Sequence, residues 1–224
     1  MWVNAAPHDR DEVVVVDGVA RWASVPAFGF APVVATGDEE FGTAPAEPVR
    51  VTVGEVLPVI VDNGLIRATI GPDGCVSSLV HVESGRELIA GGDRGALPQL
   101  HHDLPYEYDA WDIEAYYRNR VTDLDAVDSI EVTETGPLVA RVAVRRSFRS
   151  STLVQTFELR AGSERLDVDV ELDWHERDHL LKLAWPLDLL CSDVTRHIQY
   201  GHIRTPIHTN TSWDAARFEL CAHQ

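Results

Sequence analysis

The sequence lacks the long apolar segments that mark membrane and exported proteins. No apolar run approaches the roughly 18 to 20 residues that a helix needs to cross a bilayer. The first ten residues contain neither the basic start nor the apolar stretch of a signal peptide. We therefore expect neither a spanning helix nor a secretory leader.

Positive charge is scarce. The 224 residues include 19 Lys and Arg against 36 Asp and Glu, which gives a formal net charge of -17, and Lys182 is the only lysine. Such a surface repels the phosphates of nucleic acids and the anionic headgroups of membranes. We expect no nucleic-acid partner and no membrane partner.

Cysteine is also rare and is not arranged for chemistry. Cys75, Cys191 and Cys221 are widely spaced and odd in number, so no CxxC pair exists for a metal or a redox centre. This usage is typical of buried thiols in a reducing compartment. The sequence predicts a cytoplasmic protein without a cysteine-bound metal.

What the sequence has in quantity is alternation of apolar and polar residues. In residues 165–174 every second side chain is apolar and the others are charged, the pattern of a half-buried strand. Similar runs predict strands at residues 49–53, 65–70, 130–133, 138–145, 153–159 and 180–185. Short turns rich in Gly, Pro and Asp separate the runs, without an amphipathic helix between them. The sequence therefore predicts an all-β fold, a large antiparallel β-sandwich.

The beginning of the chain has a different character. Residues 1–35 contain one short strand pattern and several Pro and Gly, too little to bury a core alone. Residues 36–48 are small, acidic and proline-containing, as linkers are. We expect a small β segment of an incomplete domain (1–35), a linker (36–48) and a sandwich (49–224) that is truncated at its C-terminal end.

Two histidine motifs have metal-ligand spacing. Residues 175–179 read HExxH, which binds zinc when a helix places both histidines on one face. Here the motif falls between two strand patterns, so we expect the turn of a hairpin and no zinc. His101 and Asp103 form an HxD pair without an identifiable third ligand, which favours a surface loop.

A third stretch, residues 103–117, mixes aromatic residues with carboxylates. Aromatic faces cover the apolar patches of a sugar and carboxylates accept hydrogen bonds from its hydroxyls. The alternative is a loop whose aromatic side chains plug the end of the sandwich. The candidate substrate-binding residues are Tyr108, Asp109, Trp111 and Asp112.

Residues 200–219 are dense in polar and aromatic side chains. Such density indicates either a polar network that holds a long loop or direct contact with a ligand. We favour the network, formed by His202, Arg204, His208, Asn210, Trp213, Asp214 and Arg217.

Three blocks of the sequence resemble the signatures of glycoside hydrolase family 38, in its cytosolic and bacterial α-mannosidase branch. They are residues 109–113 (DAWDI), residues 173–176 (DWHE) with 181–182, and residues 201–219, in the family's order and spacing. Residues 3–30 resemble the small β segment that precedes the sandwich in that family. Departures are His101 and His102, where apolar and acidic residues are more usual, and Ile207 in place of Thr.

The resemblance implies a retaining, zinc-dependent enzyme that hydrolyses terminal α-mannosides by double displacement. Its barrel, with the zinc and the nucleophile, and its helical bundle have no counterpart here. The resemblance therefore implies a non-catalytic part of a galactose-mutarotase-like supersandwich, which packs on both missing domains. No catalytic residue, metal ligand or cofactor is expected in this chain. Its ligand would be a mannose-containing oligosaccharide bound through the whole enzyme.

Two other functions remain as alternatives. A free-standing carbohydrate-binding module would bind mannose without the rest of an enzyme. An aldose-mutarotase-type epimerase would need a histidine and a carboxylate converging on a concave sheet.

Overall fold

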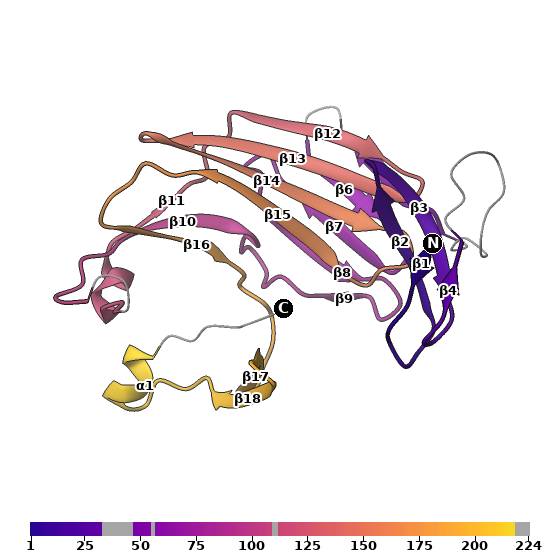
Figure 1. The fold of residues 1–224 in the computed structure, drawn as a ribbon. Helices are drawn as coiled ribbons and strands as arrows, with labels where there is room; N and C mark the ends of the chain where they lie inside the picture. The colour runs from indigo at the N-terminus through magenta and orange to yellow at the C-terminus, as the bar shows by residue number, and fades with distance from the viewer. Residues whose placement is uncertain (33–46, 55–56, 109–111, 218–224) are drawn as a thin grey trace.

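The chain folds almost entirely into antiparallel strands (Figure 1). The structure, a computed structural model, describes residues 1–32, 47–54, 57–108 and 112–217. The strands are β1 (Trp2–Val3), β2 (Arg10–Val16), β3 (Val19–Val25), β4 (Phe30–Ala31), β5 (Arg50–Val53), β6 (Val59–Asp62), β7 (Ile66–Ile70), β8 (Val76–His81), β9 (Arg86–Glu87), β10 (Leu97–His102), β11 (Val121–Asp123), β12 (Ser129–Thr135), β13 (Val139–Phe148), β14 (Ser151–Arg160), β15 (Leu166–Asp173), β16 (His179–Ala184), β17 (Asp193–Ile198) and β18 (Gly201–Pro206). Two short helices, η1 (Ala115–Asn119) and α1 (Ser212–Ala216), complete the elements. Among the described residues, no helix is long and apolar enough to cross a membrane.

The strands form two facing layers. One layer contains the five-stranded sheet β5-β6-β7-β8-β9, and the other contains the four-stranded sheet β12-β13-β14-β15. A three-stranded sheet, β11-β10-β16, lies opposite the end of the four-stranded sheet where β14 begins (Figure 1). The predicted all-β, antiparallel β-sandwich is confirmed.

The main core lies between the five-stranded and four-stranded sheets. Val59, Ala68 and Ile70 from one sheet pack with Val142 and Phe157 from the other, and all five are almost completely buried. A smaller core joins Leu100 of β10 to Phe148 and Leu153 at the other end of the long strands. Since burial of apolar area is the main favourable term in folding, the sandwich is the stable part of the molecule.

The alternating runs from residue 130 onward all correspond to observed strands, within a few residues at their ends. The predicted runs did not include β1, β3, β4, β6, β8, β9, β10, β11, β17 or β18. Strand β10 is buried on both faces over Leu97 and Pro98, which removes the alternation from which a strand is recognised.

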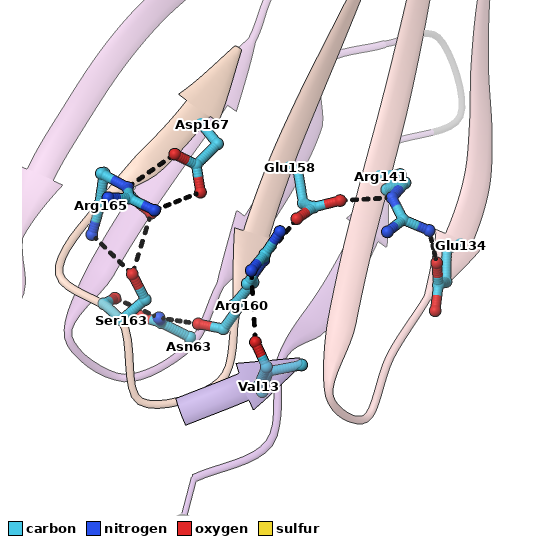
Figure 2. A network of polar contacts seen from close by, with 9 residues as sticks. All are labelled: Val13, Asn63, Glu134, Arg141, Glu158, Arg160, Ser163, Arg165 and Asp167. Atoms are coloured by element: carbon cyan, nitrogen blue, oxygen red, sulfur yellow. Dashed lines mark hydrogen bonds and ion pairs between the residues drawn. The ribbon is translucent and has the colours of Figure 1, made fainter. Parts of the chain in front are cut away.

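The N-terminal segment packs on the sandwich. Val13 of the β2–β3 hairpin belongs to the main core, and its carbonyl oxygen accepts a hydrogen bond of 3.2 Å from Arg160 Nη1. Figure 2 shows that Arg160 is the end of a line of ion pairs across the sheet, which runs through Glu158 and Arg141 to Glu134. Residues 36–46 of the expected linker lie outside the described residues.

The expectation of a hairpin turn at residues 175–179 is wrong. Strand β15 pairs with β14, whereas β16 pairs with β10 in a different sheet. The five residues between β15 and β16 therefore carry the chain from one layer to the other (Figure 1). An alternating pattern interrupted by a short turn is the same for a hairpin and for such a crossing, so the sequence did not distinguish them.

Candidate functional site

The aromatic and acidic stretch forms a loop between β10 and β11. The loop is closed at its base, where His101 pairs with Val121 and the His102 N–H donates a hydrogen bond of 3.0 Å to the Arg120 carbonyl oxygen. Its last turn is the helix η1. We call residues 103–119 the aromatic loop. Its described residues, 103–108 and 112–119, project from one end of the sandwich on a base of paired strands (Figure 1).

One buried tyrosine anchors the aromatic loop. Tyr117 is only 6% exposed, and its hydroxyl oxygen accepts hydrogen bonds from Lys182 Nζ at 3.0 Å and from Arg118 Nε at 3.3 Å. Lys182 Nζ also lies 4.9 Å from the ring centroid, within the range of a cation–π contact. The chain's only lysine therefore holds this loop to strand β16.

These contacts change the acidity of the anchor. Burial alone would raise the pKa of Tyr117, but the hydrogen bonds from Lys182 and Arg118 outweigh it and lower that pKa. His101 packs edge-on against the same ring, with 5.1 Å between the centroids. Burial lowers the pKa of His101, which favours the neutral ring, while its hydrogen bond to the Tyr117 carbonyl oxygen opposes the shift.

Other aromatic side chains of the loop face solvent. Tyr106 is 88% exposed, and Tyr108 and Tyr116 are also exposed. The Tyr108 carbonyl oxygen accepts a hydrogen bond of 2.9 Å from the N–H of Asp112, which bends the loop and places Asp112 at the surface. The predicted substrate residues Asp109 and Trp111 lie outside the described residues.

The aromatic loop meets the C-terminal segment. Arg118 donates hydrogen bonds from Nη1 to the Ala215 carbonyl oxygen at 3.1 Å and from Nη2 to the Arg217 carbonyl oxygen at 3.4 Å. Trp213, on helix α1, is 85% exposed. Arg118 thus joins two stretches that are about a hundred residues apart in sequence.

Three of the seven residues of the predicted polar network lie together, and Arg204 lies apart from them. Asp214 contacts His208 at 3.4 Å and Arg217 at 2.9 Å, and its pKa is lowered mainly by a hydrogen bond from Thr211. Arg204 instead pairs with Asp193 across the β17–β18 hairpin.

The other members of the set lie at the surface. Asn210 and Trp213 are exposed and make no side-chain hydrogen bond with another described residue, and His202 is an exposed residue of β18. The network itself stays a prediction, and the observed contacts are short-range and mostly near the surface.

The HExxH histidines serve separate local contacts. His175 Nε2 lies 2.9 Å from Asp173, and His179 Nδ1 contacts the Arg177 carbonyl oxygen. Glu176 accepts hydrogen bonds from the Ser150 N–H and the Ser151 hydroxyl. Within residues 1–32, 47–54, 57–108 and 112–217, no group of three or more His, Cys, Asp or Glu could hold a metal ion.

Sequence reasoning missed the residues that position the aromatic loop. Tyr117, Arg118 and Lys182 were not singled out for this role, and His101 was expected in a surface loop, whereas it is a buried residue of β10. The one available signal was the isolated lysine in an arginine-rich chain. Its partner could not be identified, because Tyr117 and Lys182 are 65 residues apart and meet only through the pairing of β10 with β16.

The sequence matches a family model over most of its length. Residues 61–224 match the model described as glycosyl hydrolases family 38 C-terminal domain. Among curated proteins, the chain is 35% identical to alpha-mannosidase 2C1 of Mus musculus and 36% identical to that of Homo sapiens, in each case over 99% of the chain. It is 30% identical to alpha-mannosidase G of Dictyostelium discoideum over 74% of the chain.

Solved structures share the fold. An alpha-mannosidase from Enterococcus faecalis aligns with 92% of the chain at a TM-score of 0.57 and 12% sequence identity, and the alignment covers 27% of that protein. The chain spans 22% of the length of the mouse and human relatives. From the family model and these relatives, we conclude that the chain belongs to glycosyl hydrolase family 38 and carries the family's C-terminal domain.

Proposed function

We propose that this chain is a non-catalytic β-sandwich portion of a retaining α-mannosidase that hydrolyses terminal α-mannosides. The proposal is supported by 35–36% identity to proteins named alpha-mannosidase over 99% of the chain, of whose length it spans 22%. In this proposal the barrel and helical domains belong to other parts of the polypeptide. The sandwich packs on both, and the whole enzyme binds the mannose-containing oligosaccharide.

The aromatic loop is the part of the chain that we place at the rim of the sugar pocket. The observation that carries this assignment is a rigid base beneath exposed aromatic side chains, with Tyr117 buried and Tyr106 88% exposed. Exposed aromatic rings with neighbouring carboxylates provide the stacking surface and hydrogen-bond acceptors that a sugar requires. In this role Tyr108, Asp109, Trp111 and Asp112 contact substrate without taking part in bond cleavage.

The proposal places no zinc in this chain. The HExxH residues make their local contacts on a crossing between two sheets, where the two histidines do not share a helical face. We therefore assign the zinc of the proposed enzyme to its catalytic domain, where it would bind sugar hydroxyls. The described residues of this chain would only position and cover the substrate.

A cytoplasmic location is part of the proposal. Cys75 and Cys191 are free thiols, and burial together with the nearby Asp73 raises the pKa of the Cys75 thiol to about 12. Such a thiol stays protonated at neutral pH and is a poor nucleophile. Fractionation of cells that express the full-length protein should recover it with cytosolic markers; recovery with secreted proteins would contradict this location.

The function is tested by comparing two polypeptides with an aryl α-mannoside as substrate. The full-length protein that contains this chain should release the aryl group, and the 224-residue chain alone should not. Turnover by the isolated chain, or its absence in the folded, zinc-loaded full-length protein, would contradict the proposal.

A further inference from the structure

A cavity of about 400 Å³ at the base of the aromatic loop gathers basic side chains. Its lining includes His102, Arg120, Arg149 and His179, and none of its described lining residues is acidic. The whole chain has nearly twice as many acidic as basic residues, so this local excess runs against the overall charge. The charge of its lining therefore suits the cavity to an anionic ligand.

The four basic residues come from four segments that the fold brings together. His102 of β10 and His179 of β16 are cross-strand partners, with ring centroids 5.3 Å apart and planes at 87°. Arg120 directly precedes β11, and its carbonyl oxygen accepts the hydrogen bond that closes the loop. Arg149 lies in the turn between β13 and β14 with a φ of 49°. The facing layers thus supply cationic groups to the cavity from both sides.

One carboxylate, that of Glu176, lies close enough to Arg149 and His179 to offset part of their charge. The nearest carboxylate to Arg149 is that of Glu176, with 3.8 Å between Nη1 and Oε2, which is too long for a hydrogen bond. Glu176 Oε1 is already used by Ser150 and Ser151. Arg120 has no ion pair with any residue that the structure describes. Two guanidinium groups beside one cavity repel each other unless an anion lies between them.

The histidines have unused hydrogen-bonding capacity. His179 Nδ1 faces the Arg177 carbonyl oxygen and therefore carries a proton, whereas its Nε2 makes no hydrogen bond within the described residues. With the described residues, the His102 ring makes only the ring contact with His179. Thr122, which also lines the cavity, adds a hydroxyl donor.

We propose that this cavity binds a phosphate group, either as inorganic phosphate or as the monoester of a small molecule. Donors that converge from several segments suit a tetrahedral dianion, whereas a planar carboxylate is satisfied by one arginine. Arg120 and Arg149 supply the charge-assisted hydrogen bonds, and His102, His179 and Thr122 complete the donor set. The cavity is larger than a phosphate ion, which leaves room for an esterified group.

Calorimetric titration of the purified 224-residue chain in a chloride buffer tests the site. Inorganic phosphate and mannose 6-phosphate serve as probes, with unphosphorylated mannose as the uncharged comparison. Saturable binding of phosphate that weakens as salt is added is the expected result. Tighter binding of the monoester would identify an esterified ligand, and equal binding would identify phosphate itself. Absence of saturable binding by either phosphate probe, in protein whose circular dichroism is that of a β fold, overturns the proposal.

Two variants locate the binding. Arg120→Gln and Arg149→Gln should each weaken the phosphate affinity about tenfold, since each removes a charge-assisted hydrogen bond. Arg165→Gln is the matched control, because Arg165 is exposed and lies between β14 and β15 at the opposite end of the sheet. Arg120→Gln should keep the fold, because the hydrogen bond that Arg120 contributes to the base of the loop comes from its backbone carbonyl. An unchanged phosphate affinity in Arg120→Gln and Arg149→Gln would show that phosphate binds outside this cavity. An equal loss of affinity in Arg165→Gln would show the same.

Discussion

Strands β14 and β15 are neighbours with the same alternating pattern, yet they differ in how well their apolar sides are covered. On β14, Phe157 is 1% exposed and Leu159 is fully buried. On β15, Val170 is 38% exposed and Leu172 is 41% exposed, although Leu172 lies directly beside the buried Leu153. Alternation in a sequence identifies the side of a strand that avoids water, but it does not identify what covers that side.

The difference follows from position in the sheet. Strand β14 has paired neighbours on both sides, whereas β15 is an edge strand among the described residues. A groove of about 1030 Å³ borders β15 and is lined in part by Leu166, Leu183 and Trp185. Burial of apolar side chains should therefore contribute much to the free energy of unfolding on β14 and little toward the end of β15.

The largest effect is expected from Phe157→Ala. Removal of a fully buried aromatic side chain from between the two sheets should cost about 3–5 kcal/mol of unfolding free energy. Urea unfolding followed by circular dichroism measures the change. A loss below about 1 kcal/mol would contradict a main core between β5–β9 and β12–β15.

The outer side of β14 provides the second test. Glu158 accepts hydrogen bonds from Arg141 and Arg160, and its side chain is only 12% exposed. Burial alone would raise the pKa of Glu158, but the bonds from Arg160 and Arg141 lower it below the ordinary value of 4.5. Glu158→Gln should cost about 1–3 kcal/mol at neutral pH, because both arginines lose a charged partner.

The lowered pKa of Glu158 also determines how the stability difference between the original protein and Glu158→Gln depends on pH. A carboxyl group with a depressed folded-state pKa contributes stability above its unfolded pKa and loses it as the pH falls through the folded pKa. The gap between the original protein and Glu158→Gln should therefore shrink below about pH 4.5. A gap that is constant from neutral pH into this range would contradict the ion-pair account.

The anchor of the aromatic loop should show a smaller effect. Tyr117→Phe leaves Lys182 and Arg118 without their shared acceptor, which should cost about 1 kcal/mol. Limited proteolysis should then cut within residues 103–119 sooner than in the original protein. Tyr116→Phe is the matched control, because Tyr116 is exposed and should leave the cleavage rate unchanged. Equal cleavage rates in Tyr117→Phe and Tyr116→Phe would contradict the role of Tyr117 as the anchor of the aromatic loop.

The smallest effect is expected from an apolar side chain of β15. Leu172→Ala removes a side chain that is 41% exposed and should cost less than about 1 kcal/mol in the 224-residue chain, against several for Phe157→Ala. The same urea unfolding experiment measures both variants. A cost for Leu172→Ala close to that of Phe157→Ala would show that the apolar side of β15 is covered.

Much of the sandwich could be predicted because its long strands alternate cleanly, as in β13, β14 and β15. What could not be predicted depends on contacts between distant segments. The crossing at residues 174–178 requires knowledge of which sheet receives β16. The aromatic composition of the loop pointed to Tyr108 and Asp112, but its anchoring by Tyr117 and Lys182 depends on the pairing of β10 with β16. The local sequence pattern predicts where strands lie and which residues a loop contains. The position of a loop in the fold depends instead on which distant strands pair.

The most direct test of the account is the kinetics of the full-length protein with a mannose-containing substrate. Tyr108→Ala should raise KM or lower kcat/KM about tenfold or more, because an exposed aromatic ring at the pocket rim would lose its stacking contact with the sugar. Tyr200→Ala, which removes an exposed tyrosine of the β17–β18 turn, should leave both constants unchanged. Unchanged kinetics in Tyr108→Ala would contradict the assignment of the aromatic loop to the sugar pocket.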